Sequence, residues 1–270
     1  MIVTVCIPTY NGAAYLRQAI DSVLSQGYGD FELVIIDNHS TDDTVAIVQS
    51  YADPRIRFLQ NSTNLGLQAN WNRCLDEARG RYVKLLPADD VLAPDCLARQ
   101  VAALESDESL ALAFCARTII DSAGKAIMVR GYPGAFEGVM GADDILRRCV
   151  RRGTNLLGEP GGVLFRRALA RQVGGFDTSV PYVTDFDYWC RLLAHGDAWY
   201  TPDALVSFRV SRQSWSVAIG AGQGRDYRRF VARMIDAGAI QASAFDRLLG
   251  AAMSGLNGML RQALYSLVLK

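Results

Sequence analysis

In the first 120 residues, short β-branched runs alternate with longer amphipathic segments. This alternation is compatible with only a few folds. Each kind of element spaces its apolar side chains differently, so the short runs predict strands and the longer segments predict helices. The predicted strands are 2–7, 31–36, 56–59, 82–86 and 110–120, and the predicted helices are 14–25, 43–51, 68–78 and 94–104. Strands that alternate with helices form a mostly parallel sheet covered on both faces. The predicted fold class is therefore α/β, with a Rossmann-like central sheet flanked by helices.

The part of the chain after residue 120 is less regular. It predicts a hairpin turn at 122–125, a Gly/Pro-rich loop at 158–162, a helix at 186–194 and a last strand at 204–210. The composition changes around 219–224, and residues 225–269 predict two or three helices. We therefore expect a main domain over residues 1–218, with halves at about 1–120 and 121–218, and a C-terminal helical segment over 219–270.

Composition and charge exclude several classes of protein. The 270 residues include 28 basic and 28 acidic side chains and are half hydrophobic, so the chain can bury a full core and has no bulk charge for a nucleic acid partner. Six widely spaced cysteines without a Cys-x-x-Cys pair favour buried thiols in a reducing compartment. The amino terminus lacks the pattern of an export signal, and no apolar run is long enough to span a membrane. We expect a cytoplasmic protein that can touch the inner membrane peripherally.

Small polar residues directly follow the first two predicted strands. Residues 8–12 read Pro-Thr-Tyr-Asn-Gly, and residues 37–44 read Asp-Asn-His-Ser-Thr-Asp-Asp-Thr. Their backbone N–H groups and side chains suit a nucleotide, and Asp37 could accept a hydrogen bond from a base. Ser40 or Thr41 is also a good helix N-cap candidate, an alternative that leaves Asp37 unexplained. The sequence contains neither the Gly-rich dinucleotide fingerprint nor a Walker A loop.

Two adjacent carboxylates, Asp89 and Asp90, follow the predicted strand 82–86. At the carboxyl edge of a parallel sheet, such a pair can hold a divalent cation and, through it, a phosphate. Taken alone, the pair is more typical of a turn or a helix cap. The polar segments upstream favour the ligand-binding interpretation.

The order of these motifs resembles the inverting glycosyltransferases of family 2, which have the GT-A fold. The resemblance covers about residues 2–216. Its segments are 7–12 (IPTYNG), 33–44 (LVIIDNHSTDDT), 64–66 (NLG), 70–72 (NWN), 80–83 (GRYV), 89–90 (DD), 175–177 (GFD), 184–191 (TDFDYWCR) and 208–209 (FR). Several motifs in the right order are more specific than any one of them. The resemblance implies a GT-A fold with a C-terminal helical appendage, and transfer of a sugar with inversion from a nucleotide-diphospho-sugar to an acceptor hydroxyl.

The resemblance also implies roles for the residues at matching positions. The donor-binding residues would be Pro8, Thr9, Tyr10, Asn11, Asp37, Asn64, Asp89, Asp90 and Arg209. Asp89 would be the ligand of a divalent cation, Mn²⁺ or Mg²⁺, which offsets the charge that grows on the leaving diphosphate. Asp185 would be the catalytic base that takes the proton of the acceptor hydroxyl.

Three further residues are weaker candidates. Asp187 is the alternative base. It lies two positions after Asp185 on the predicted helix, and side chains at this spacing face different directions, so both cannot point into one site. Arg191 could reach a phosphate or form an internal ion pair. Glu159 begins a loop that would line the acceptor side. Without the resemblance, Asp185 itself reads better as a carboxylate stabilised by the positive end of a helix.

Two positions depart from the family pattern. Pro87 stands at the first position of the Asp-x-Asp metal motif, and Ser211 stands where a histidine often helps to hold the metal or the diphosphate. These departures keep open a second hypothesis, a catalytically inactive nucleotide-sugar-binding protein of the same fold. A third hypothesis, nucleotidyl transfer, would want a basic Gly-rich loop after the first strand, and residues 8–13 contain no basic side chain.

The expected partners are a nucleotide-diphospho-sugar, with a UDP- or dTDP-sugar favoured, and a saccharide or lipid-linked acceptor of a bacterial surface polysaccharide. The basic residues near apolar positions of the C-terminal segment are Arg225, Arg228, Arg229 and Arg233. Such a segment could rest on an anionic membrane. Packing on the catalytic domain, or a homodimer contact, is the preferred alternative, since Asp226, Asp236 and Asp246 interrupt the positive charge.

Overall fold

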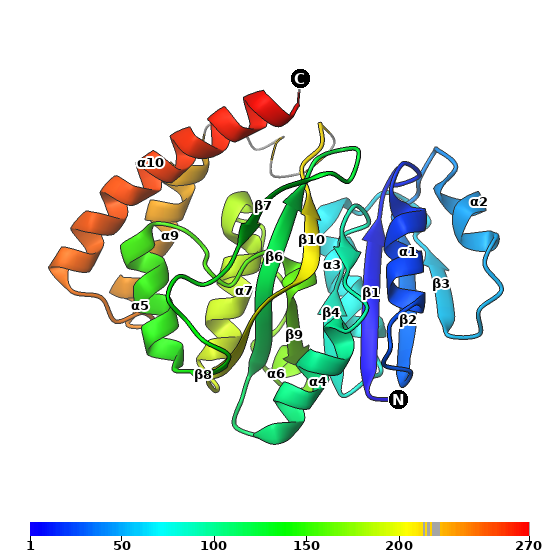
Figure 1. Ribbon diagram of the computed structural model, residues 1–270, viewed down its shortest axis with the longest axis horizontal. Helices are drawn as coiled ribbons and strands as arrows, with labels where there is room; N and C mark the ends of the chain where they lie inside the picture. The colour runs from blue at the N-terminus through cyan, green and yellow to red at the C-terminus, as the bar shows by residue number, and fades with distance from the viewer. Residues whose placement is uncertain (213, 215–216, 218–221, 270) are drawn as a thin grey trace.

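The computed structural model describes residues 1–212, 214, 217 and 222–269. A central ten-stranded sheet runs through the molecule, with helices on both faces and a long C-terminal helix across one end (Figure 1). The first half contains β1 (Val3–Thr9), α1 (Leu16–Leu24), β2 (Phe31–Asp37), α2 (Thr44–Gln49), β3 (Ile56–Gln60), α3 (Gly66–Glu77), β4 (Tyr82–Leu85), β5 (Val91–Leu92), α4 (Cys96–Ser106) and β6 (Leu112–Ile120). Each predicted element of this half is present within a few residues of its expected bounds.

The second half adds shorter pieces and the C-terminal helices. They are β7 (Ala126–Arg130), β8 (Gly138–Met140), α5 (Ala142–Arg152), the 3₁₀ turn η1 (Pro160–Gly162), β9 (Val163–Arg166), α6 (Arg167–Val173), the 3₁₀ turn η2 (Pro181–Val183), α7 (Thr184–Leu193), β10 (Ala198–Arg209), α9 (Gln223–Asp236) and α10 (Ala244–Val268). The predicted hairpin at 122–125 is confirmed, because the Asp121 N–H donates to the Lys125 carbonyl at 3.0 Å between β6 and β7. Among the strands and α-helices of this half, β7, β8, α5, β9 and α6 are not among the predicted elements, and neither is the 3₁₀ turn η2.

The sheet order β3-β2-β1-β4-β9-β6-β10-β5 confirms the α/β fold class. The pairs β1–β2, β2–β3, β1–β4 and β6–β10 are parallel, whereas β5, β7, β8 and β9 join antiparallel. The short β9 lies between β4 and β6 and joins the two parallel blocks. Because β1 and β2 pair in register from Val3 and Phe31 to Thr9 and Asp37, their polar ends lie side by side. The carboxyl ends of the parallel strands thus form one edge, the place where α/β sheets bind ligands.

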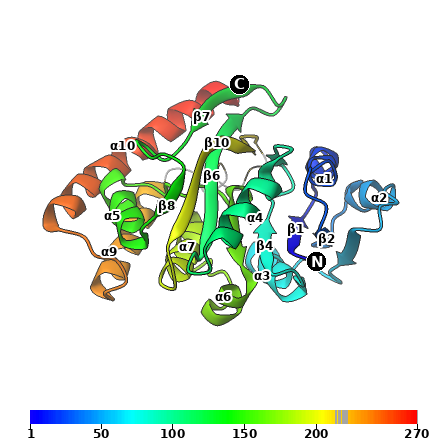
Figure 2. The same ribbon diagram turned by 60° about the horizontal axis from the view of Figure 1, so that its bottom comes forward.

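Two hydrophobic clusters cover the two faces of the sheet, as the turned view in Figure 2 helps to follow. Helices α1, α2 and α4 pack on one face, and α3, α5, α6, α7 and α9 pack on the other. Adjacent strand residues face opposite clusters, as Cys6 and Ile7 do, so a strand covered on both faces is apolar throughout. All six cysteines are buried and free, as their spacing predicted.

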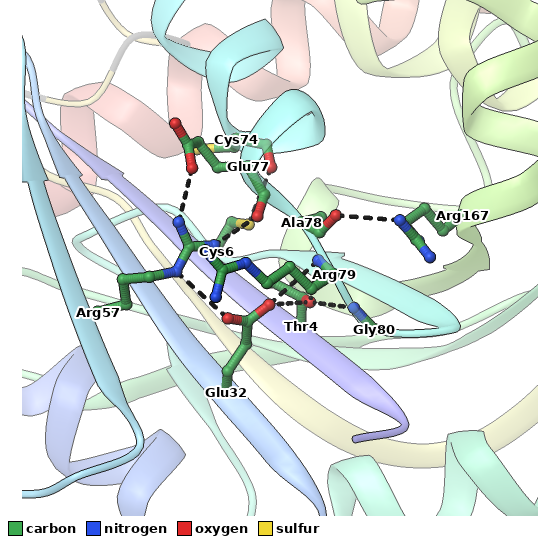
Figure 3. Close-up of polar contacts among 10 residues, drawn as sticks. All are labelled: Thr4, Cys6, Glu32, Arg57, Cys74, Glu77, Ala78, Arg79, Gly80 and Arg167. Atoms are coloured by element: carbon green, nitrogen blue, oxygen red, sulfur yellow. Dashed lines mark hydrogen bonds and ion pairs between the residues drawn. The ribbon is translucent and has the colours of Figure 1, made fainter.

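A polar network ties β1, β2 and β3 to the segment before β4 (Figure 3). Glu32 is buried, and its carboxylate accepts hydrogen bonds from the Thr4 hydroxyl at 2.6 Å and the Arg79 N–H at 3.1 Å. Arg57 bridges the same carboxylate at 3.4 Å to that of Glu77 at 2.6 Å. Gly80 fits because a Cβ there would lie 2.6 Å from the Thr4 nitrogen. The network fixes the strands at the edge opposite the ligand-binding edge.

We expect Glu32→Ala to lower the free energy of unfolding by about 1–3 kcal/mol, because the buried Thr4 hydroxyl would lose its acceptor, while the Arg79 N–H and the Arg57 guanidinium would each lose one of their partners. Urea unfolding monitored by circular dichroism measures the change. The control is Glu108→Ala, whose side chain is 90% exposed and whose loss should cost less than about 0.5 kcal/mol. Equal stability of the two variants would show that the network does not hold the sheet.

The C-terminal helices α9 and α10 pack on the rest of the domain, which is the preferred of the two interpretations of this segment. Tyr227 of α9 donates its hydroxyl to the Cys149 carbonyl of α5 at 2.7 Å. Gly250 lets α10 approach α5 so closely that a Cβ there would collide with the Val150 carbonyl. The predicted boundary at 218/219 lies outside the described residues. None of the described helices combines the length and the apolar character that crossing a membrane requires.

Candidate functional site

A cavity of about 340 Å³ opens at the carboxyl edge of β1, β4, β6 and β10. One part of its wall comes from the loops after β1 and β4, including Pro8–Gly12 and Asp89. Another part comes from η1, η2 and the start of α7, including Glu159, Tyr182 and Asp185. The C-terminal helix α10 contributes Arg261, Leu264 and Tyr265. The cavity therefore gathers residues from the whole length of the chain.

The loop after β1 is tied to the loop after β2. Asn11 has a positive φ of 49°, its N–H donates to Ser40 Oγ at 2.8 Å, and its side-chain oxygen accepts the Thr41 N–H at 2.8 Å. Thr9 Oγ1 is buried and has no hydrogen-bond partner among the described residues. Pro8, Thr9, Tyr10 and Asn11 all line the cavity, so a preformed polar wall is available to a ligand.

Asp37 and Asn64 do not line this cavity. The Asp37 carboxylate is fully buried and accepts hydrogen bonds from the Ser40 N–H at 3.1 Å and Gln60 Nε2 at 2.9 Å. Asn64 Oδ1 accepts from Asn38 Nδ2 at 2.8 Å and the Gly66 N–H at 2.9 Å. Both side chains support the loops next to the cavity, and their contact with a donor stays a prediction.

The helix-cap alternative for the loop after β2 is wrong. Helix α2 begins at Thr44, and its first residues are held by Asp42, whose Oδ1 accepts the Thr44 N–H at 3.1 Å. Ser40 instead donates its hydroxyl to Asp37. The loop is therefore organised around the buried Asp37 carboxylate and not around a cap.

The adjacent carboxylates Asp89 and Asp90 face different surroundings. Asp89 lines the cavity, and its Oδ2 accepts the Ser214 hydroxyl at 3.3 Å. Asp90 lies behind the wall, where Oδ1 accepts the Arg209 N–H at 3.0 Å. Burial raises the pKa of Asp89, and burial together with the charge of Asp89 raises the pKa of Asp90 well above its usual value. Of the pair, only Asp89 lines the cavity.

Arg209 positions Asp89 from behind and is not on the cavity wall. Its guanidinium donates to the Asp89 carbonyl at 2.9 Å, the Asp121 carbonyl at 3.2 Å and Gln18 Oε1 at 2.7 Å. It also lies 4.4 Å from the centre of the Tyr15 ring. These contacts occupy the side chain predicted to touch the donor, and they fix the backbone at Asp89.

The oxygen donors around Asp89 fit a cation shared with a ligand. Among the described residues, no three His, Cys, Asp or Glu side chains cluster as a metal cage. Mg²⁺ and Mn²⁺ are often held by one or two carboxylates, water and the phosphates of a substrate. The cavity offers the Asp89 carboxylate and the hydroxyls of Ser211 and Ser214, whose oxygens lie 3.2 Å apart. Pro87 lines the cavity as well, but its side chain has no donor atom for a metal.

Asp185 lies at the start of α7 and lines the same cavity as Asp89. Its Oδ1 accepts the Phe186 N–H at 2.7 Å, and its Oδ2 accepts Asn155 Nδ2 at 3.3 Å. Desolvation, followed by the negative charge of Glu159, raises the pKa of Asp185 to about 7. A carboxylate with this pKa is matched to accept a proton at neutral pH.

Glu159 stands beside Asp185 in an ion pair with Arg117 of β6. Its loop is held by Lys84 of β4, whose ammonium is buried and donates to the carbonyls of Gly161 at 2.7 Å and Val163 at 3.2 Å. Sequence reasoning missed Lys84, Arg117 and Asn155. The signal for the first two was a basic residue inside an apolar predicted strand, since such a charge needs a buried partner.

Asp187 and Arg191 lie outside the cavity. Arg191 binds Asp187 at 2.9 Å and donates to the carbonyls of Val173 at 2.8 Å and Gly175 at 2.9 Å. The internal ion pair, one of the two alternatives for Arg191, is therefore present. It anchors α7 to the loop before η2.

Comparison with known sequences identifies relatives of one family. Residues 4–174 match the family described as Glycosyl transferase family 2. EpsE of Bacillus subtilis (strain 168), which is named as a glycosyltransferase, is 31% identical over 216 residues that cover 77% of this chain and 72% of EpsE. The chain spans 64% to 66% of the length of the first curated relatives that it matches.

Two solved structures show the same fold. Staphylococcus aureus TarS 1-349 in complex with UDP-GlcNAc aligns with a TM-score of 0.73 at 20% identity, over 100% of this chain and 76% of that chain. The mannosyltransferase PcManGT from Pyrobaculum calidifontis, in complex with GDP-Man and Mn²⁺, aligns with a TM-score of 0.66 at 20% identity. The alignment covers 99% of this chain and 76% of that chain. The resemblance to the GT-A fold is thereby confirmed.

Proposed function

The chain belongs to glycosyl transferase family 2, and from this premise we propose that it transfers a sugar, with inversion, from a nucleotide-diphospho-sugar to an acceptor hydroxyl. The observation that carries the proposal is that Asp89 and Asp185, from distant parts of the chain, line one cavity. One carboxylate is placed among hydroxyl oxygens, and the other has a pKa of about 7. Inverting transfer needs a base on the side of the reacting sugar opposite the diphosphate, and a cation at the diphosphate would offset the charge that grows there.

The donor end of the cavity is the wall formed by the loop after β1. The Thr9 hydroxyl, which has no hydrogen-bond partner in the described part of the chain, and the rings of Tyr10 and Trp71 are suited to a nucleoside. We favour a UDP- or dTDP-sugar, and the likeness to the TarS complex with UDP-GlcNAc supports this choice. Asp37 and Asn64 would act by holding the neighbouring loops in place.

Asp89, with Ser211 and Ser214 beside it, would hold Mn²⁺ or Mg²⁺ together with the diphosphate. When bound, the cation offsets the charge on the leaving group. Arg209 keeps the Asp89 backbone fixed, so the carboxylate faces the cavity before a ligand arrives. The single protein carboxylate fits a site in which the donor supplies the remaining oxygen ligands.

Asp185 would take the proton of the acceptor hydroxyl as its oxygen attacks the anomeric carbon. The bond from that carbon to the diphosphate breaks, the nucleoside diphosphate leaves, and the sugar configuration inverts. Asn155 orients the carboxylate, and Glu159 keeps its proton affinity high. Asp187 cannot replace it, because its carboxylate is held by Arg191 outside the cavity.

The acceptor and setting that we propose rest on analogy with the family. We propose a saccharide or lipid-linked acceptor in bacterial surface polysaccharide synthesis, in the cytoplasm and peripherally at the inner membrane. We also propose that residues 1–120 bind the nucleotide and residues 121–218 the acceptor, with 219–270 as the helical segment. The alternative is a catalytically inactive nucleotide-sugar-binding protein of the same fold. Pro87 and Ser211 support this alternative, because they replace side chains that hold the metal or the diphosphate in the family pattern.

A donor panel tests the proposal. The protein is incubated with UDP-, dTDP- and GDP-sugars and Mn²⁺. Two quantities are measured, the release of the nucleoside diphosphate and the anomeric configuration of the freed sugar before it equilibrates in solution. We expect turnover of at least one uridine or thymidine donor, with the anomeric configuration inverted. Tight binding of a donor without any turnover, in the presence of a panel of saccharide acceptors, would instead support the inactive alternative.

A further inference from the structure

Arginines from three different elements gather at the end of the cavity that holds Asp185. They are Arg117 of β6, Arg130 at the end of β7, and Arg261 of α10. In both views, β7 and the C-terminal half of α10 lie close together (Figures 1 and 2). The helix α10 thus carries a charged residue into the cavity, although it lies far from the donor loop in sequence.

Two of these arginines form no ion pair with a carboxylate in the part of the chain that the structure describes. Arg117 pairs with Glu159, but among the described residues no carboxylate forms an ion pair with Arg130 or Arg261. Arg261 is held by neutral groups, donating to Gln223 Oε1 and lying 4.9 Å from the centre of the Tyr182 ring. Desolvation, followed by the positive charge of Arg117, lowers the pKa of Arg130, with Arg261 adding to the effect. At this wall the three arginines Arg117, Arg130 and Arg261 face two carboxylates, Glu159 and Asp185, so one positive charge is in excess even when both carboxylates are ionised.

The excess positive charge lies at the end of the cavity that contains Asp185, the proposed base. Tyr182, beneath Arg261, is three residues before Asp185 and lines the cavity with it. The charged neighbours of Arg130 include Glu159, which is also the strongest charged neighbour of Asp185. Asp89, by contrast, has Ser214 and Arg209 as its neighbours. The arginine pair is thus grouped with the base and not with the candidate diphosphate site.

We propose that Arg130 and Arg261 bind an anionic group of the acceptor, close to the hydroxyl that Asp185 deprotonates. The inference rests on the proposed transfer reaction, because it places the acceptor at the Asp185 end. Guanidinium groups bind phosphate and carboxylate oxygens through paired hydrogen bonds, and two of them suit a phosphate ester best. The C-terminal helix then completes the acceptor site, in addition to packing on the domain.

Isothermal titration tests the site with three small probes. Glycerol 1-phosphate, glucuronate and uncharged glycerol are titrated into the full chain saturated with UDP and Mn²⁺, which occupies the donor end. We expect glycerol 1-phosphate to bind and glycerol not to bind. Arg130→Gln and Arg261→Gln should each weaken binding about 10-fold, and the double variant about 100-fold. Binding of glucuronate alone would assign the anion to an acidic sugar.

The matched control is Arg247→Gln, which removes an exposed arginine from the same helix outside the cavity. It should bind glycerol 1-phosphate as the parent does. The proposal is overturned if neither anion binds the parent, or if the double variant binds as well as the parent. It is also overturned if the double variant, folded by circular dichroism, loses UDP affinity, since the arginines would then belong to the donor end. Failure of the proposed function is distinct, because it shows as absent donor turnover in the parent.

Discussion

Asp185→Asn is expected to lower kcat for donor turnover by about 10²- to 10⁴-fold, because the amide cannot accept the proton of the attacking hydroxyl. The affinity for the nucleoside diphosphate should change little, since Asp89 and the loop after β1 are untouched. Steady-state release of nucleoside diphosphate at saturating donor measures the change. Asp187→Asn is the matched control on the same helix, and it should retain kcat because Asp187 faces Arg191. Equal turnover of the parent and Asp185→Asn would remove Asp185 from the base role.

The same substitution should stabilise the protein at neutral and alkaline pH. The pKa of Asp185 is about 7 in the folded chain and about 4 in an unfolded one, so the unfolded state loses its proton first. Stability is therefore lost as the pH rises from about 4 to about 7, by up to about 4 kcal/mol. Asparagine does not ionise, so Asp185→Asn should be more stable than the parent at pH 8 and similar at pH 4. Urea unfolding of both proteins at both pH values measures this difference, and a difference in stability between parent and variant that is the same at pH 4 and pH 8 would contradict the raised pKa.

Asp89→Ala is expected to weaken binding of nucleoside diphosphate in Mn²⁺ by about 10- to 100-fold and to abolish the effect of the metal on binding. The physical reason is that Asp89 is the carboxylate that faces the cavity beside Ser214. Titration of UDP with and without Mn²⁺ measures both quantities. If the metal changes nothing in the parent and Asp89→Ala binds normally, the metal assignment is wrong.

Asp90→Asn provides the control for this experiment. The amide that replaces the carboxylate would keep an oxygen that can accept the Arg209 N–H, and Asp90 lies behind the cavity wall. The variant should therefore bind UDP within about 3-fold of the parent, with its metal dependence intact. A loss as large as that of Asp89→Ala would show that Asp90 also contacts the ligand.

The fold of the first 120 residues could be predicted because local periodicity and sheet position agree there. The elements that the sequence did not predict are of two kinds. Strand β9 has only four residues, and its place between β4 and β6 is set by long-range pairing that leaves no local signal. Helix α5 did leave one, with two aspartates in its first turn, two arginines in its last turn and Gly153 in a left-handed C-cap.

The site divides in the same way between local and tertiary information. Motif order predicts roles for Asp89, Asp185 and the loop after β1, and the structure brings all three to one cavity. Residue type does not show which way a side chain faces, so the sequence predicts ligand contacts for Asp37 and Arg209, whose side chains are buried away from the cavity. Arg130 and Arg261 were missed because only the packing of α10 on the domain brings them to one wall.

The most direct test of this account is the pH dependence of kcat/KM for the donor in the parent and in Glu159→Gln. The parent should show an activity that rises with pH to a plateau, with a midpoint near 7 set by Asp185. Glu159→Gln removes a negative charge beside Asp185 and frees the positive charge of Arg117, and both changes favour the ionised carboxylate. The midpoint should therefore move down by about one unit. A flat profile in the parent, or a midpoint that stays or rises in the variant, would contradict the assignment of Asp185 as the base.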